Sequence, residues 1–592
     1  MSPLSTRLIR PALAALGAAA FLTIAGCTGD KAASDNTPVS EVAAAPMMDI
    51  LLQPHLSAAS EVNAIDIAIV IPAPEAKAGV PFLSMAIMRV MAPGALNDPA
   101  SLTARDDLGP LPMTIEEDPE DPSSFRQDRR WIPQRDTAGD VHVSYTIQPR
   151  AITPSTRPGP LIDTRTELSG FYGSGNTMLA LPVDGWPRHV RVDWDLSEMP
   201  EGARAASSLG LGTVESEVTS ENLNNTFFMA GPLKSQPESG DGEFVVYWMT
   251  PAAFDLEGAA QWTKTGYAYF TEFFGQDVPA FRIFMRTTER FQGGGGGGFN
   301  SFIFGTVDGE DRDPDEVRSL LAHETLHHFV GGYGDGGGAG GQQWYSEGVT
   351  SYYTIVLPYR ADLTSPYKFI DAFNAHAENY YTNPRSNLSN DDVTALFFSD
   401  SNAQVVPYNR GPLYIALLDA RMRAATGGEK RVDDLIFRFI AERDSATDAT
   451  ALWRQILVDA LGEAGGAEFD GMMQGAPLDF PDDMFGPCFQ GEPQTLQAYS
   501  LGFRPYVDDA GVTRAGPVSP DSPADKAGIK RYDVINNADV LAAASDGIPG
   551  ETILLDITRD GTPLSFTVSP WTAPSTGLQW RRTDVAEDAC DL

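Results

Sequence analysis

Residues 321–327 read Leu-Ala-His-Glu-Thr-Leu-His, and residues 344–348 read Trp-Tyr-Ser-Glu-Gly. On a helix, His323 and His327 lie about 40° apart around the axis and about 6 Å apart along it, so both imidazoles can bind one metal ion. Glu347 follows His327 by twenty residues and can bring a carboxylate from a second helix. Two imidazoles and one carboxylate suit zinc and leave its fourth position open, so the sequence predicts one Zn²⁺ per chain.

Glu324 stands next to this ligand pair. A carboxylate here can accept the proton of an attacking water while the cation polarises a substrate carbonyl, which is the hydrolytic chemistry of the motif. We therefore expect Glu324 to be the general base of a zinc peptidase. Glu324 and His328 form a second pair at the same spacing, but that assignment would leave His323 and His327 without a role, so we expect His328 to pack beside the site.

Helix signals surround the motif. Residues 313–316 read Asp-Pro-Asp-Glu, which offers an N-cap, a proline at the first helical position and an acidic first turn, and two glycines follow at 331–332. The alternative is that the histidines only cap or pack a surface helix. Three of the seven histidines fall within residues 323–328, which simple packing does not explain.

The N-terminus carries a targeting pattern. Two arginines precede an apolar stretch over residues 13–24, and Ala-Gly stands directly before Cys27. This order predicts a bacterial lipoprotein signal peptide over residues 1–26, cleavage before Cys27 and a lipid on that cysteine. An uncleaved anchor or an ordinary secretory signal is the alternative. No aspartate follows Cys27, which by resemblance to known sorting rules favours the outer membrane, with the protein facing the periplasm. Residues 27–58 are expected to form the lipidated cysteine and a tether.

Charge and cysteines limit the partners and the compartment. The 592-residue chain has a formal charge of −38, so nucleic acid is not an expected partner, and its densest acidic run, residues 116–121, is predicted to be an exposed loop. Besides Cys27, the chain holds Cys488 and Cys590. An even pair in an oxidising compartment predicts a disulfide, with two unpaired thiols as the alternative.

The hydrophobic pattern changes along the chain from alternation to helical periodicity. Strands are predicted over residues 65–71, 141–147 and 190–194, and helices over 256–274, 313–330, 344–357, 411–425 and 431–442. The sequence therefore predicts a multidomain α+β protein. Its N-terminal all-β domain is expected to span residues 59–245, and a mostly α catalytic domain residues 246–488.

Two glycine-rich runs flank the histidine helix. Six glycines at 293–298 precede an apolar run over 299–304, and a glycine strand lets a peptide backbone approach closely and pair at its edge. We therefore expect Gly296, Gly297 and Gly298 to bind peptide substrate, with an irregular loop as the alternative. The second run, residues 331–341, is expected to be a loop near the cleft.

These motifs occur in the order found in the glycyl aminopeptidase family of gluzincin zinc metallopeptidases, which this chain resembles. That family follows its His-Glu-x-x-His helix with Trp-x-x-Glu-Gly-x-Thr-x-Tyr-Tyr, and residues 344–353 match every specified position. Residues 408–411 echo its Tyr-x-Lys-Gly element, and residues 427–434 echo its Gly-Gly-x-x-x-x-Asp-Asp stretch. The resemblance covers most of the mature chain.

By this resemblance, the expected layout is an N-terminal β domain, a thermolysin-like catalytic domain and a C-terminal PDZ domain. The positions that match the motifs imply zinc binding by His323, His327 and Glu347, and a general base in Glu324. The resemblance also implies that Tyr408 donates a hydrogen bond to the oxyanion of the reaction. A buried structural tyrosine is the alternative for Tyr408.

A second resemblance lies near the C-terminus. Residues 500–503, Ser-Leu-Gly-Phe, resemble the PDZ loop that receives a peptide carboxylate on backbone amides, and residues 518–529 resemble the strand, turn and short helix that follow. This implies a PDZ domain over residues 495–572 in which Leu501, Gly502 and Phe503 bind a peptide ligand. A purely structural role is the alternative, and residues 573–592 are expected to form a C-terminal tail.

The sequence thus predicts zinc-dependent hydrolysis of peptide bonds by a membrane-anchored lipoprotein, with aminopeptidase action favoured. One departure keeps alternatives open. The family follows its glycine strand with Leu-Glu-His, which helps to receive the free amine of the substrate, whereas residues 296–300 read Gly-Gly-Gly-Phe-Asn. Endopeptidase action is one alternative, and a catalytically silent lipoprotein that only binds peptides is the other.

Overall fold

The computed structural model describes residues 46–90, 92–121, 126–151, 161–276, 278–288, 295–333, 342–397, 400–507, 511–545, 547–586 and 590. The expected signal peptide and Cys27 lie outside these residues. The described chain forms two compact units: the first holds residues up to 268 together with 278–328, and the second holds 269–276 and the residues from 329 on. Within the described part, no helix combines the length and the apolar character needed to cross a membrane.

The first unit is rich in β-structure, as its alternating pattern predicts. Its largest sheet has the order β16-β13-β1-β2-β9-β5-β6. The strands are β1 (Met47–Leu56), β2 (Val62–Ile71), β5 (Thr103–Asp106), β6 (Gly109–Pro110), β9 (Val141–Ile147), β13 (Arg188–Trp194) and β16 (Val214–Val218). Alternate side chains of β2, including Ile65, Ile67 and Ile69, are buried in the core of the unit.

Strand β1 corrects the expected start of the fold. Residues 47–56 fall inside the segment expected to be a tether, yet β1 pairs with β2 and with β13 inside the sheet. The sequence obscured the strand because Leu51 is apolar although its side chain points outward and is 38% exposed. Apolar residues on both faces hide the alternation by which a half-buried strand is recognised.

Two further sheets complete the β-rich part of the first unit. One has the order β10-β11-β17-β14-β15, and the other has the order β12-β3-β8-β7, with β4 paired to β3. The strands are β3 (Leu83–Arg89), β4 (Ala92–Pro93), β7 (Met113–Glu117), β8 (Gln127–Pro133), β10 (Arg165–Glu167), β11 (Gly170–Ser174), β12 (Leu181–Pro182), β14 (Arg204–Ser207), β15 (Gly210–Leu211) and β17 (Phe227–Gly231). Short helices are η1 (Pro99–Ser101), α1 (Gly175–Met178) and α2 (Ser220–Asn224). The acidic run over 116–121 begins in β7 rather than in a loop, with Glu116 and Glu117 exposed.

A mixed sheet leads directly into the histidine helix. Its order is β18-β19-β20-β22-β21, with strands β18 (Lys234–Gln236), β19 (Phe244–Trp248), β20 (Phe281–Thr288), β21 (Gly295–Gly298) and β22 (Ser301–Val307). Helix α3 (Leu256–Phe274) connects the parallel neighbours β19 and β20. The glycine strand β21 forms an edge and pairs antiparallel with β22. A Cβ on Gly295 would lie 2.1 Å from the ring of Phe302, so only glycine fits there.

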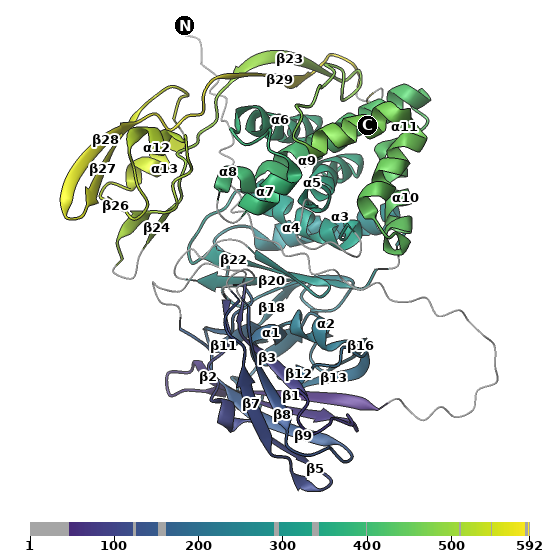
Figure 1. Ribbon diagram of the computed structural model, residues 1–592, viewed down its shortest axis with the longest axis vertical. Helices are drawn as coiled ribbons and strands as arrows, with labels where there is room; N and C mark the ends of the chain where they lie inside the picture. The colour runs from purple at the N-terminus through teal and green to yellow at the C-terminus, as the bar shows by residue number, and fades with distance from the viewer. Residues whose placement is uncertain are drawn as a thin grey trace. The chain divides into compact units, whose positions relative to one another are not determined.

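The second unit begins with a helical region. Its helices are α5 (Gln343–Arg360), α6 (Pro366–Thr382), α7 (Asn390–Leu396), α8 (Ser401–Gln404), α9 (Val406–Thr426), α10 (Val432–Glu442), η2 (Arg443–Ser445) and α11 (Ala449–Met473). Figure 1 shows α5, α6 and α9 lying side by side. Helices α5 and α9 touch through two glycines, since a Cβ built on Gly411 would lie 2.4 Å from the Cα of Gly348.

The C-terminal module has its own sheet and core. The strand order is β24-β25-β26-β27-β28, with strands β24 (Pro505–Val507), β25 (Thr513–Ala515), β26 (Val534–Ile535), β27 (Ile553–Arg559) and β28 (Thr562–Val568). Helices α12 (Pro523–Ala527) and α13 (Asp539–Ser545) lie beside this sheet, as the yellow part of Figure 1 shows. Leu501, Phe503, Leu555 and Ile557 are buried together in its core.

Residues on either side of the module pair with each other and correct the expected tail. Strand β29 (Ser575–Arg582) lies in the segment 573–592 and pairs antiparallel with β23 (Phe489–Leu496) along its whole length. Trp580 is buried, and its backbone exchanges two hydrogen bonds with the side chain of Asn374. The eight residues of β29 include two large apolar side chains, so their pattern alone did not reveal the strand.

Candidate metal centre

Helix α4 (Pro314–Val330) carries the two histidines. The carboxylate of Asp313 accepts a hydrogen bond from the backbone N–H of Asp315 at 2.8 Å, which satisfies one of the free donors at the start of the helix. Gly331 adopts a φ of +65° directly after Val330, the left-handed conformation that commonly ends a helix. The helix expected from the sequence over 313–330 is therefore present with these end signals in use.

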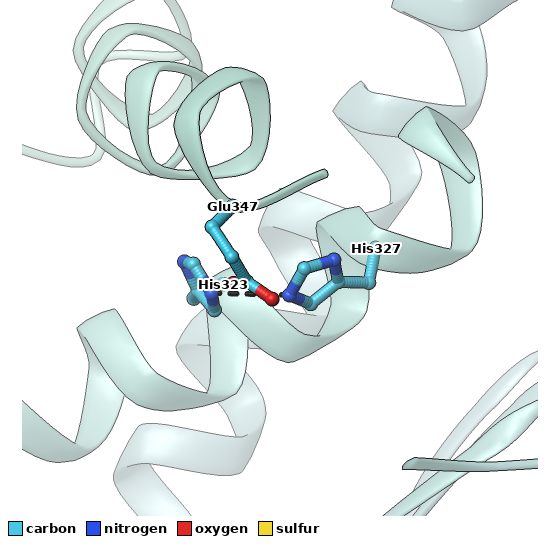
Figure 2. Close-up of side chains that lie close together, drawn as sticks. All are labelled: His323, His327 and Glu347. Atoms are coloured by element: carbon cyan, nitrogen blue, oxygen red, sulfur yellow. Dashed lines mark hydrogen bonds between the residues drawn. The ribbon is translucent and has the colours of Figure 1, made fainter. Parts of the chain in front are cut away.

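The structure brings His323, His327 and Glu347 together. One ligand atom from each lies within 4.8 Å of the others, although Glu347 comes from α5. Figure 2 shows both imidazole rings and the carboxylate converging on one point. The Nε2 atoms of the two histidines are 3.1 Å apart.

These distances fit a shared metal ion. Two bonds of about 2.05 Å at a tetrahedral angle place the two nitrogens about 3.3 Å apart, close to the separation observed. The side chain of Glu347 is 2% exposed, and a buried carboxylate is rare unless it is paired or binds a metal. The donor set of two imidazoles and one carboxylate is consistent with a zinc cofactor.

Glu324 and His328 lie on the same helix. Glu324 is 4% exposed and follows His323 directly in the chain, so its carboxylate is shielded from bulk water. His328 contacts the ring of Phe281, and its Nε2 lies 3.0 Å from the carbonyl oxygen of Pro279. Burial lowers the pKa of His328 to about 4, so its ring is neutral and donates its N–H to that carbonyl.

Buried polar contacts, made by residues that follow Glu347 on α5, hold this helix in place. The hydroxyl of Tyr353 donates to one carboxylate oxygen of Asp433 at 2.9 Å, and Arg360 donates to the other at 2.7 Å. Asp433 is on α10, so these bonds fix α5 to that helix. The pKa of Asp433 is raised above its ordinary value because the carboxyl is buried, although the adjacent Arg360 opposes this shift.

Tyr408 lies in the first turn of α9 and is half-buried. Gly411, three residues after Tyr408, makes the close contact with Gly348. Gly348 directly follows Glu347 in the chain. Arg410 is buried and donates to the carbonyl oxygens of Ser386 and Leu388. The start of α9 is thus fixed both against α5 and against the segment before α7.

The remaining candidate residues lie elsewhere. Gly296, Gly297 and Gly298 are in the edge strand β21, whereas Gly293 and Gly294 lie outside the described residues, as does most of the second glycine run. Gly502 turns with a φ of +92°, and the side chains of Leu501 and Phe503 point into the core of the C-terminal module.

Cys488 and Cys590 form a disulfide whose Cα atoms are 5.4 Å apart.

One residue near the site had no signal in the sequence. Arg443 follows α10 and donates hydrogen bonds to the carbonyl oxygen of Val330 and to the hydroxyl of Tyr345. It stands almost a hundred residues beyond Tyr345 and in no motif, and a single arginine after a helix has many ordinary explanations.

One segment of the chain is similar to a known protein family. The family described as M61 glycyl aminopeptidase matches residues 339–410, a segment that contains Glu347 and Tyr408. None of the curated protein sequences matches the chain significantly.

One solved structure shows a likeness of fold, and two others align with lower TM-scores. An aminopeptidase N family protein from Idiomarina loihiensis aligns with a TM-score of 0.63 at 12% identity, covering 90% of this chain and 98% of that chain. An M1 zinc metallopeptidase from Deinococcus radiodurans aligns with a TM-score of 0.41 at 14% identity, covering 74% of this chain and 95% of that chain. Yeast LTA4 hydrolase aligns with a TM-score of 0.44 at 12% identity, covering 74% of this chain and 69% of that chain.

Proposed function

We propose that this chain, which is a zinc metallopeptidase, removes residues from the free amino ends of peptides. The observation that carries the proposal is the convergence of His323, His327 and Glu347 next to the buried Glu324. The match of residues 339–410 to the M61 glycyl aminopeptidase family supports aminopeptidase action.

The roles of the individual residues follow from their chemistry. When bound by His323, His327 and Glu347, zinc acts as a Lewis acid toward the peptide carbonyl. Glu324 accepts the proton of the attacking water and passes it to the departing amine, which must leave as a neutral group. Tyr408 donates a hydrogen bond to the carbonyl oxygen as negative charge develops on it.

The glycine strand supplies a surface for the substrate backbone. Gly296, Gly297 and Gly298 lie on β21, which is an edge strand of its sheet among the residues that the structure describes, and an edge strand can add an extended peptide as a further strand. Gly297 is exposed, and without side chains the edge gives a peptide backbone room to approach.

Endopeptidase action is the second candidate, and the same strand favours it. After Gly298 the chain continues with Phe299 and Asn300 at the turn to β22, so the glutamate that the resembled family places after its glycine strand is missing. Without that glutamate to receive the free amine, internal peptide bonds could also enter. A catalytically silent peptide-binding lipoprotein would need a site that binds metal and peptide without hydrolysis.

We place the protein at the outer membrane, facing the periplasm, through a lipid on Cys27. The order of arginines, apolar stretch and Ala-Gly-Cys supports this, and the Cys488–Cys590 disulfide suits an oxidising compartment. Replacing Cys27 with alanine is expected to move the protein from the membrane to the soluble fraction.

The C-terminal module is proposed to be a PDZ domain over residues 495–572 whose loop Leu501-Gly502-Phe503 binds a peptide end. Its buried core and the turn at Gly502 support that proposal.

Paired peptides with free and acetylated amino ends test the proposed activity, using protein from residue 28 loaded with zinc. The control is Glu324→Gln, which keeps the shape of the side chain and removes the base. We expect the wild-type protein to cleave only the peptide with the free amino end. We expect the rate of this cleavage to be at least about 100-fold lower in the variant. Cleavage of both peptides would support the endopeptidase, and cleavage of neither would support the binding protein.

A further inference from the structure

The third metal ligand is separated from the first two by a stretch whose sequence does little to fix their distance. Residues 331–341 read Gly-Gly-Tyr-Gly-Asp-Gly-Gly-Gly-Ala-Gly-Gly. Glycine has the most backbone freedom to lose on folding, so holding the two ends of such a stretch at one separation is entropically unfavourable. Contacts outside the stretch must therefore set the position of Glu347 relative to the histidines.

Arg443 makes such a contact on both sides of the glycine-rich stretch. Its Nη1 donates to the carbonyl oxygen of Val330 at 2.6 Å and lies 3.3 Å from the hydroxyl oxygen of Tyr345. One guanidinium nitrogen carries two hydrogens, so both bonds can form together. Val330 lies three residues after His327, and Tyr345 lies two residues before Glu347.

The contact with Val330 meets a specific need of α4. Val330 is the last residue of the helix, where carbonyl oxygens have no intrahelical partner and the helix dipole is negative. A guanidinium supplies both the missing donor and the complementary charge. The fit is close, because a Cβ on Gly331 would lie 2.6 Å from the Nη2 of Arg443.

The contact with Tyr345 lies within a packed aromatic cluster. The ring of Tyr345 is fully buried and lies 4.9 Å from that of Phe439, on the helix that precedes Arg443. The side chain of Arg443 is 11% exposed, so its hydrogen bonds are shielded from competing water. Arg443 directly follows α10, so this helix fixes the point from which the arginine side chain holds the end of α4 and the start of α5.

We infer that Arg443 is a positioning residue of the metal centre, which sets Glu347 against His323 and His327 by joining the end of α4 to the start of α5. Its hydrogen bonds are with Val330 and Tyr345 and not with the three metal-binding side chains. The inference rests on the proposed zinc function and makes zinc affinity, rather than activity alone, the property that Arg443 controls.

Zinc affinity of the whole mature protein, measured by competition with a chelating dye, tests the inference. Arg443→Met keeps the apolar stem and removes the guanidinium, and it is expected to weaken zinc binding by about 10- to 100-fold. Arg443→Lys keeps the charge without the fork and should lose less. Tyr345→Phe, which removes one acceptor, should weaken binding by a smaller factor.

The matched control is Arg438→Met on α10, the helix that directly precedes Arg443. Arg438 pairs with Glu442 and Asp459 at the surface. Its loss should leave zinc affinity unchanged.

The thermal midpoint of the metal-free protein separates positioning from general stability. If Arg443→Met and Arg443→Lys lower that midpoint but bind zinc as tightly as wild type, Arg443 is only structural and the inference is overturned. If the wild-type protein itself binds no zinc, the proposed function fails instead.

Discussion

His55 of the first unit lies between two carboxylates. Its Nδ1 lies 2.9 Å from a carboxylate oxygen of Glu198, and its Nε2 lies 2.9 Å from one of Asp66. The hydrogen bond to Glu198 is the largest contribution that raises the pKa of His55, and Asp66 adds to it against partial burial. Asp195 is a third acidic group that interacts electrostatically with His55.

A raised pKa means that protonated His55 stabilises the folded state. This stabilisation is fully present below the ordinary histidine pKa of about 6.5 and is lost as the pH rises through the raised value. His55→Gln should therefore lower the thermal midpoint more at pH 6 than at pH 9. An equal difference at both pH values, measured by circular dichroism, would contradict this.

At the scale of elements, the contact between α5 and α9 depends on two glycines. A Cβ on Gly411 would lie 2.4 Å from the Cα of Gly348 and 2.9 Å from the carbonyl oxygen of Trp344. Backbone atoms cannot move aside as a flexible side chain can, so α5 and α9 would have to separate. Glu347 and Tyr408, which adjoin this contact on the two helices, would shift with them.

Gly411→Ala is therefore expected to lower stability by about 1–3 kcal/mol and to weaken hydrolysis beyond the loss of folded protein. The control is Gly471→Ala on α11, where the new Cβ would meet Ala476 at an ordinary 3.5 Å. That change should keep or slightly raise stability because alanine favours helix. If Gly411→Ala unfolds at the wild-type temperature and cleaves peptides at the wild-type rate, the result would argue against a tight contact between α5 and α9.

At the scale of the whole molecule, a disulfide and the pairing of β23 with β29 join the two ends of the C-terminal module. Cys488 precedes β23 and Cys590 follows β29, so the disulfide encloses the module and spans 102 residues. A cross-link over a loop of this length restricts the unfolded chain strongly, by about 4–5 kcal/mol in the loop-entropy model.

Cys590→Ser should lower the thermal midpoint under non-reducing conditions. A reductant should lower that of the wild-type protein to a similar value and leave the variant unchanged. If the variant unfolds at the wild-type temperature, the strands β23 and β29 hold the module without help from the disulfide.

Local patterns predicted the elements whose signals lie within one stretch of chain. The helices over 256–274 and 313–330 and the strand over 141–147 occur in the structure with the same or nearly the same bounds, because amphipathic spacing and end signals act over a few residues. The sequence did not reveal β29, whose stability comes from pairing with β23 across the whole module. Nor did it reveal β1, whose outward-facing Leu51 hides the alternation.

By itself, the sequence determined that His323 and His327 share one face of a helix with Glu324 beside them, because helix geometry fixes residues four apart. Only the tertiary structure decided that Glu347 meets that pair, since its distance depends on how α4 and α5 are held across a glycine-rich stretch. Only the tertiary structure decided two further contacts: that of Arg443 with Val330, and that of Gly348 with Gly411. They join residues distant in sequence, and burial and shape rather than local preference determine them.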